Sequence, residues 1–262
     1  MKGKVYLVGA GPGDPEMLTV KALRLLRTAE AVLHDDLVAP EVLALISPMA
    51  QVQNVGKRCG KKKISQEEIN FLMVTLADAG VSVVRLKSGD PMIFGRAGEE
   101  IEALRRAGIE YEIVPGVTSA LGAAAVAEIP LTHRRASSAV VFLTAHQAAG
   151  SDAADWNKLA GSGATLILYM PGRGYGEVGA RLKAAGLAGD TPCLLVSRAT
   201  TRFQQTHVTT VAELSASPHL PAPTLLIVGE VVARAEASVL IQDLVVPAVS
   251  EDAAGTSSKE LA

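Results

Sequence analysis

The amino-acid sequence predicts an α/β protein in which mostly parallel strands are covered by helices. Three observations lead to this fold class. Short apolar runs alternate with helical patterns through the first half of the chain. Predicted helix starts carry capping residues, as at Asp14 with Pro15 and at Ser65 with Glu68. Turns rich in small residues follow several predicted strands, at the edge where open parallel sheets bind ligands.

The predicted elements follow one another in two groups. In the first group we expect strands at residues 5–8, 31–33, 52–55, 81–86 and 111–114, and helices at 16–29, 65–79 and 98–107. A helix of small residues at 118–127 opens the second group, with strands at 139–144, 165–169, 192–197 and 224–228 and a helix at 175–185. These groups predict domains at 1–116 and 117–245, and the tail at 246–262 is expected to be disordered.

Composition and charge limit the classes of function. Apolar residues make up 48% of the chain, enough for a large core, and the formal net charge is −2. This balance predicts neither nucleic-acid binding nor adsorption to an anionic membrane. The chain has no apolar run of membrane-spanning length and no signal-peptide pattern at its start, so we expect a cytoplasmic protein. Cys59 and Cys193 are far apart and the histidines are scattered, which predicts neither a disulfide framework nor a metal site.

The first glycine-rich turn, Gly9 to Pro15, follows the first predicted strand. A dinucleotide-binding GxGxxG pattern starting at Gly9 would need glycine at position 14, where Asp14 stands. Pro12 also removes a backbone N–H that a phosphate would need. The residues favour a tight turn that shapes a cleft for a ligand other than a phosphate, although a plain strand-to-helix turn stays open.

Two further turns have similar character. The turn at Ser88–Gly89–Asp90 places a carboxylate where it can accept hydrogen bonds from a ligand hydroxyl or amine, or merely cap its own turn before Pro91. In the third turn, Thr118 or Ser119 either caps the small-residue helix or directs a hydroxyl toward the ligand.

Five segments in a fixed order carry a resemblance to a known family. They are residues 8–15 (VGAGPGDP), 85–91 (RLKSGDP), 94–96 (FGR), 114–120 (VPGVTSA) and 129–134 (IPLTHR). Together they closely resemble the uroporphyrinogen-III C-methyltransferases, a branch of the tetrapyrrole methylases. The resemblance covers roughly residues 3–240. It implies two α/β domains, each a mixed sheet flanked by helices, with the active-site cleft between them, and a homodimer.

The resemblance also implies a methyl donor, S-adenosylmethionine, and no metal. By motif, the donor-binding residues would be Pro12, Ser88, Gly89, Asp90, Ile93, Thr118, Ser119, Met170 and Ala199. Two positions depart from the family pattern: Ser88 replaces a glycine, and His34 stands where a tyrosine is common. Serine is small enough that we expect donor binding to survive, whereas His34 alters a detail of the substrate pocket.

The implied reaction is two methyl transfers to uroporphyrinogen III, at C-2 and C-7, which give precorrin-2 through precorrin-1 and release S-adenosylhomocysteine. Precorrin-2 leads toward sirohaem or cobalamin. By resemblance Asp35 is the general base and Lys57 the proton donor, although Asp35 could instead cap a helix and Lys57 could be solvated.

The macrocycle is a polyanion, so its pocket needs cations. Arg96 and Arg134, with Glu99 nearby, are the candidates for substrate binding. A basic run supplies further cations at Lys57, Arg58, Lys61, Lys62 and Lys63, or is simply a solvated loop.

Three alternatives remain beside this reading. One is another tetrapyrrole methylase, acting later in cobalamin synthesis. The second is a nucleotide-dependent oxidoreductase on a Rossmann sheet, against which Pro12 and Asp14 argue. The third is a non-catalytic binding module, which the presence of both Asp35 and Lys57 disfavours.

Overall fold

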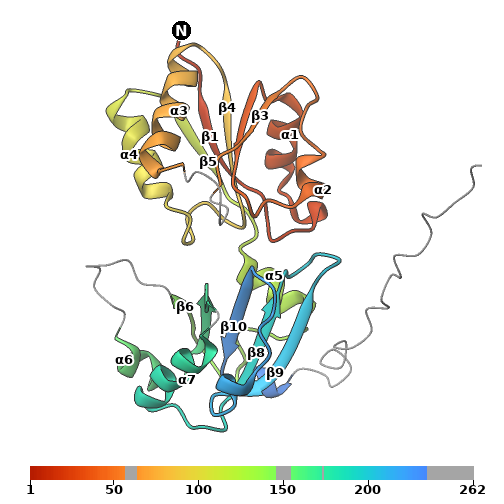
Figure 1. The fold of residues 1–262 in the computed structure, drawn as a ribbon, viewed down its shortest axis with the longest axis vertical. Helices are drawn as coiled ribbons and strands as arrows, with labels where there is room; N and C mark the ends of the chain where they lie inside the picture. Colours follow the sequence, from red (N-terminus) through yellow and green to blue (C-terminus); the bar gives the residue numbers. More distant parts are fainter. Residues whose placement is uncertain (57–63, 146–154, 173, 235–262) are drawn as a thin grey trace, which may run out of the picture.

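A computed structural model describes residues 1–56, 64–145, 155–172 and 174–234. Its described strands form two five-stranded sheets, one above the other in Figure 1. The first sheet has the order β3-β2-β4-β1-β5, and its pairings are all parallel. Its strands are β1 (Val5–Gly9), β2 (Ala31–His34), β3 (Gln51–Asn54), β4 (Val83–Lys87) and β5 (Tyr111–Val114). We call this sheet and the helices that cover it the first lobe.

Helices cover both faces of the first sheet, because side chains alternate along each strand. On one face, α1 (Val20–Thr28) and α2 (Pro40–Leu43) enclose a core that includes Val8 and Val32. On the other face, α3 (Gln66–Asp78) and α4 (Ala97–Arg106) enclose a core that includes Leu7 and Leu33. The predicted parallel sheet covered by helices is confirmed.

The second sheet is mixed and has the order β6-β7-β10-β8-β9. Strands β6 and β7 pair in parallel, whereas the other pairings are antiparallel. Its strands are β6 (Val140–Thr144), β7 (Thr165–Tyr169), β8 (Pro192–Ser197), β9 (Gln205–Thr210) and β10 (Thr224–Val228). This sheet and its helices form the second lobe. The boundary at residue 116 stays a prediction.

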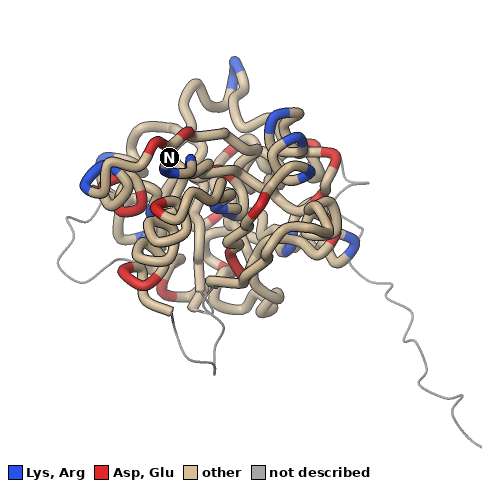
Figure 2. The backbone as a smooth tube through the Cα atoms, turned by 90° about the horizontal axis from the view of Figure 1, so that it is seen from above, with Lys and Arg blue, Asp and Glu red and all other residues tan. Residues whose placement is uncertain are grey.

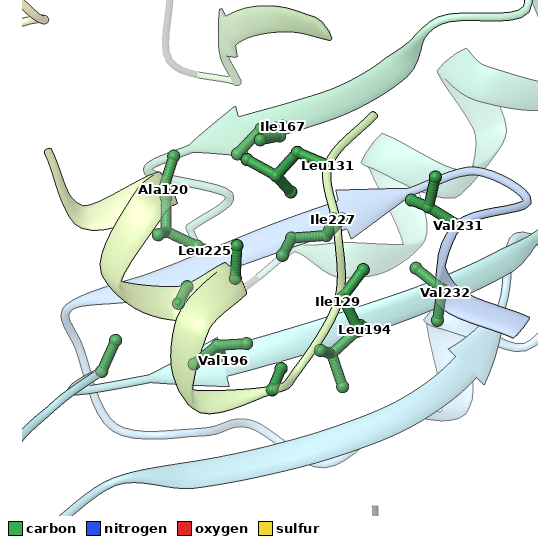
Figure 3. Packing of buried hydrophobic residues seen from close by; sticks show 14 of the residues in the cluster. Ala120, Ile129, Leu131, Ile167, Leu194, Val196, Leu225, Ile227, Val231 and Val232 are labelled. Carbon is green, nitrogen blue, oxygen red and sulfur yellow. The ribbon is translucent and has the colours of Figure 1, made fainter. Parts of the chain in front are cut away.

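The small-residue helix α5 (Ser119–Val126) packs on one face of the second sheet. Figure 3 shows Ala120 on this helix together with Ile167 of β7, Leu225 of β10 and Val196 of β8, which belong to the same buried cluster. Alanines let the helix lie close to the strands, where larger side chains would hold it away. The opposite face is covered by α6 (Trp156–Ala160) and α7 (Tyr175–Ala184).

One predicted helix is wrong in its first part. We expected a continuous helix at 16–29, but residues Pro15–Met17 form a separate 3₁₀ turn, capped by the Asp14 side chain as predicted. The chain is then extended at Leu18, and the Thr19 hydroxyl caps the new helix α1 by accepting from Ala22 N at 3.1 Å. A second capping residue thus restarted the helix after one turn.

Three elements of the structure have no counterpart in the sequence prediction. They are the short helices α2 and α6 and the edge strand β9. Strand β9 reads QTHVTT, so it lacks the apolar run by which the other strands were recognised. Two other short 3₁₀ turns follow β9 and β10, at Leu214–Ala216 and Val232–Arg234.

Charged residues of both signs are interspersed along the described chain (Figure 2). None of the helices in the described ranges has both the length and the hydropathy that crossing a bilayer requires. The predicted tail at 246–262 and Lys57, with the rest of the basic run to Lys63, lie outside the described residues.

Candidate active site

Three glycine turns meet at the carboxyl ends of β1, β4 and β5. Gly89 N donates to Gly11 O at 2.8 Å, and Gly11 N donates back to Gly89 O at 3.2 Å. Gly9 and Gly116 are in backbone contact, since a Cβ added at Gly9 would lie 2.6 Å from Gly116 Cα. A side chain at Gly9 or Gly116 would push the turns apart, so glycine is required for this close approach.

The Asp90 carboxylate joins two of these turns. Its Oδ2 accepts from Gly116 N at 3.0 Å, and its Oδ1 accepts from Met92 N at 2.8 Å. The turn-capping role is therefore present. Each carboxylate oxygen has more than one lone pair, so the capped Asp90 can still accept a hydrogen bond from a ligand. Ser88, next to Gly89, is half-buried in the same turn.

The second lobe contacts the first glycine turn from two sides. Asp14 N donates to Thr200 Oγ1 at 3.1 Å, and a Cβ added at Gly13 would lie 3.1 Å from the same oxygen. On the other side, a Cβ added at Gly122 of α5 would lie 2.7 Å from Pro12 Cγ. Residues from both lobes therefore enclose the turn at 12–14, and we call this region the junction.

A second contact between the lobes centres on Tyr169. Its hydroxyl lies 2.6 Å from Thr118 Oγ1 and accepts from Ala120 N at 3.4 Å. Its ring lies 4.9 Å from that of Phe94, a residue of the loop after β4, and Ile93 packs against the same core. Thr118 occupies the N-cap position of α5, but its side chain makes no cap hydrogen bond. Ser119, the first residue of α5, is half-buried beside it.

Most of the non-glycine residues with left-handed backbone angles in the described chain lie in loops at the junction. Their φ values are between 48° and 66°, at Phe94, Arg96, Met170, Arg198 and Thr200. Ala199, between the last two, is buried, whereas the Met170 side chain is half exposed. Such conformations carry strain in residues other than glycine, and strained residues gather at ligand sites.

Asp35 follows β2 at the same edge of the first sheet. Its N–H donates to Leu86 O at 3.0 Å, which extends the ladder between β2 and β4. Its carboxylate forms an ion pair with Arg85 and stays 27% exposed. The alternative role as a helix cap is wrong, because the N-cap of the next helix, α2, is Ala39. His34 is buried, with Nδ1 3.0 Å from Asp35 O.

Behind Asp35 lies a buried group of charges. Arg85 Nε donates to Glu100 Oε1 at 2.9 Å, and Lys87 Nζ donates to the same oxygen at 3.0 Å. Gln66 adds a third donor at 3.3 Å. Glu100 Oε2 lies 2.9 Å from Lys87 Nζ as an ion pair, without hydrogen-bond geometry. Burial and the nearby Arg85 lower the pKa of Lys87 more than Glu100 and Asp35 raise it.

The predicted substrate residues lie near the surface. Arg96 precedes α4 and donates from Nε and Nη2 to the two oxygens of Glu99, both at 2.7 Å. This hydrogen bonding raises the pKa of Arg96, so its charge is permanent at any working pH. Arg134 is exposed in the turn between His133 and Ser137.

Sequence reasoning missed several members of this site. Arg85, Lys87 and Glu100 all lie in the motifs that carry the resemblance or just after them, yet nothing local marked them as buried. A strand ending Arg-Leu-Lys places both cations on one face, which was the available signal. Tyr169 and Thr200 gave no such signal, because only the contact between the lobes selects them.

The groups at the junction fit the methyl donor that the resemblance implies. The donor offers ribose hydroxyls, a cationic amine and a cationic sulfur. The site offers hydrogen-bonding groups that suit them: the hydroxyls of Thr118, Tyr169 and Thr200 and the carboxylate of Asp90. The exposed side chains of Phe94 and Met170 offer apolar surface to a base. In the described chain no cluster of three or more His, Cys, Asp or Glu side chains is arranged to hold a metal ion.

Comparison with known proteins places the fold among described families. Residues 4–215 match the family model of tetrapyrrole (corrin/porphyrin) methylases. A siroheme synthase of Yersinia enterocolitica is 50% identical over 232 residues, which are 88% of this chain and 49% of that protein. The chain spans about half the length of this and other siroheme synthases that it matches.

Two further relatives match over most of their length. A uroporphyrinogen-III C-methyltransferase of Paracoccus denitrificans is 47% identical over 251 residues, which are 94% of this chain and 87% of that protein. The crystal structure of a uroporphyrin-III C-methyl transferase from Thermus thermophilus, complexed with S-adenyl homocysteine, matches with a TM-score of 0.78. That match has 40% identity and covers 88% of this chain and 100% of that one.

Proposed function

The chain belongs to the tetrapyrrole methylase family, and from this premise we propose that it methylates uroporphyrinogen III with S-adenosylmethionine. The reaction makes two transfers, at C-2 and C-7, and yields precorrin-2 through precorrin-1 and S-adenosylhomocysteine. The observation that carries the proposal is the junction, where the first glycine turn meets the hydroxyl of Thr200 and the third turn meets that of Tyr169, with the Asp35 carboxylate following β2 at the same edge of the first sheet.

For the donor we propose the residues around this junction. Pro12, Asp90, Thr118 and Ala199 border the contacts between the lobes, together with Ser88, Gly89, Ile93, Ser119 and Met170. When bound, S-adenosylmethionine supplies a methyl carbon on a sulfonium, which forms a C–C bond to a pyrrole carbon while the C–S electron pair stays on sulfur. The junction residues hold the donor and align it, which is a large part of catalysis by positioning.

Asp35 accepts the proton that the methylated ring loses, so the positive charge on the macrocycle is removed. Its position supports this role, because the carboxylate is ion-paired on its inner side and 27% exposed on the other. Lys57 is proposed as the proton donor on the family resemblance alone.

For the substrate carboxylates we propose Arg96 and Arg134, with Glu99. Arg96 presents a guanidinium held in a bidentate pair with Glu99, the geometry that a propionate or acetate side chain of the macrocycle would take up. We propose further that the enzyme is a homodimer, as the family resemblance implies, and that it is cytoplasmic.

Anaerobic incubation with uroporphyrinogen III and S-adenosylmethionine, followed by mass analysis, tests the function. We expect a gain of one methyl group and then of a second. No gain, or a gain only on a later macrocycle of the cobalamin route, would contradict it. Tight binding of NAD without binding of S-adenosylmethionine would instead favour an oxidoreductase.

A further inference from the structure

The charged side chains behind Asp35 are buried at a place where the fold does not need them. Arg85, Lys87 and Glu100 are at most 2% exposed, and each fills a volume in the interior where apolar side chains are the usual occupants. Because burying an ion pair costs about as much as the pair returns, apolar replacements would stabilise the fold equally well. A reason other than stability is therefore needed for three buried charges.

Their hydrogen bonds form a chain that ends at the exposed carboxylate. Glu100 holds Nε of Arg85 at 2.9 Å, and Nη1 of Arg85 lies 3.3 Å from each of two carbonyls, Leu33 O and Leu86 O. With Nε and Nη1 engaged, the planar guanidinium has one orientation, and Nη2 donates to Asp35 Oδ1. Leu33 is the register partner of Arg85, so the pairing of β2 with β4 sets this geometry.

The cluster contains as many cationic side chains as carboxylates. Arg85 and Lys87 carry two positive charges in this cluster, and Glu100 and Asp35 carry two negative charges. The same network also contacts the loop before α4, because a Cβ added at Gly95 would lie 3.1 Å from Lys87 Cε. The network thus joins the candidate base to the loop that carries Arg96.

We propose that Arg85 and Glu100 are positioning residues for methyl transfer: buried Glu100 fixes the Arg85 guanidinium, which in turn holds the Asp35 carboxylate at the sheet edge. This inference rests on the proposed function, in which Asp35 receives the ring proton. Neither residue needs to touch the substrate, and both act through the orientation of one carboxylate. A base held at a fixed place needs no reorganisation when the proton leaves the ring.

The first test is Glu100→Gln in the full chain, with Glu102→Gln as the matched control. Glu102 lies on the same helix but is exposed, and within the described residues its ion-pair partner is Arg106. We expect Glu100→Gln to lower kcat by about 10- to 100-fold. The affinity for S-adenosylhomocysteine should stay within about twofold, because the junction is untouched. Rates are expressed per site that binds S-adenosylhomocysteine, so unfolded protein does not count. An unchanged kcat per binding site overturns the proposal.

A double-mutant cycle then separates positioning from a general structural effect. If Glu100 acts through Asp35, the double variant Asp35→Asn with Glu100→Gln is no slower in a single turnover than Asp35→Asn alone. If Glu100→Gln slows the Asp35→Asn enzyme by the same factor as it slows the parent, the proposal is wrong.

Should Glu100→Gln fail to fold, the variant Glu100→Gln with Lys87→Met takes its place. It removes one charge of each sign, so the buried cluster stays neutral and folding is retained. We expect this variant to remain slow, since Arg85 still lacks its anchor, and recovery of the parent kcat would overturn the proposal. A parent enzyme that transfers no methyl group at all would refute the proposed function. An active parent with an equally active Glu100→Gln variant would refute only the positioning role.

Discussion

The two lobes bury different kinds of polar groups. In the first lobe the buried polar side chains include Arg85, Lys87 and Glu100, which must neutralise one another. In the described part of the second lobe, from Thr118 to Ser217, the buried polar side chains are all serines and threonines. Hydroxyls are satisfied by a single nearby carbonyl, as Ser137 is by Ala139 O at 2.9 Å. Buried charges demand a whole network.

This difference assigns separate tasks to the lobes. The charged network ends at Asp35, whose carboxylate is 27% exposed, and under the proposed function proton transfer would belong to the first lobe. The second lobe offers neutral hydroxyls at Tyr169 and Thr200 and an apolar core behind them. We propose that it shapes the donor site and moves no protons. Variants in the first lobe should therefore lower the turnover number, and variants in the second lobe should weaken the binding of the donor.

The largest effect is expected for Asp35→Asn. The amide keeps the size of the carboxylate but cannot take a proton, so turnover should fall by about 10²- to 10⁴-fold. Kinetics with uroporphyrinogen III measure the turnover number, and calorimetry with S-adenosylhomocysteine measures the affinity of the donor site. Asp78→Asn, on an exposed surface pair with Lys2, is the control. Loss of donor affinity in Asp35→Asn would assign this residue to the donor site and remove the division of tasks.

Gly9→Ala tests the close packing of the first-lobe turns. Its Cβ would lie 2.6 Å from the backbone of Gly116, and backbone cannot move aside as a flexible side chain can. We expect the free energy of unfolding to fall by about 2–3 kcal/mol. Gly98→Ala is the matched control, since a Cβ there meets nothing within 4 Å in α4 and should raise stability by about 1 kcal/mol. Equal stability of the two variants in denaturant titrations would refute the packing argument.

Tyr169→Phe tests the second lobe. Removal of the hydroxyl leaves buried Thr118 Oγ1 and the N–H of Ala120 without their partner. We expect about tenfold weaker binding of S-adenosylhomocysteine, with a smaller change in kcat. Tyr175→Phe, in the apolar core on the other sheet face, should leave the affinity unchanged. A fall in kcat with unchanged affinity would show that the second lobe takes part in the chemistry.

The smallest effect at neutral pH concerns Cys193, a buried thiol of the second lobe. Burial raises the pKa of its thiol from 9.0 to about 12, so the buried thiol is neutral. The first lobe, in contrast, buries charged side chains in pairs. Between these values the unfolded state loses the proton first, and stability falls as pH rises. At pH 10 the loss is about 1.4 kcal/mol. The difference in unfolding free energy between the parent and Cys193→Ala should show this slope above pH 9 and none below.

Much of the fold followed from local patterns. The parallel strands of the first lobe, the Ser65 capping box and the helix at Tyr175–Ala184 were predicted from periodicity and capping residues. Strand β9 was not, because its threonines and glutamine lack an apolar run and its place comes from pairing with β8. The extra turn before α1 was missed because two capping residues, Asp14 and Thr19, stand close together.

Resemblance and structure contributed differently to the site. Asp35 was selected by the family resemblance and Asp90 by its motif, and the structure shows the contacts that hold each in place. Arg85 lies in the same motif as Asp90, and Glu100 lies four residues after the next motif, but neither had an assigned role. Their relation is visible only when α4 is packed on the sheet.

The sequence by itself determined most of the strands, the capped helices and the glycine turns, because each depends on backbone angles and side-chain spacing within a few residues. Only the tertiary structure decided which groups meet. Glu100 and Arg85 are 15 residues apart and Asp14 and Thr200 are 186 apart, so no local pattern links them. Burial also sets the free-energy cost of these charges. A charged side chain in contact with water needs no partner, but the same side chain buried against the sheet must be paired.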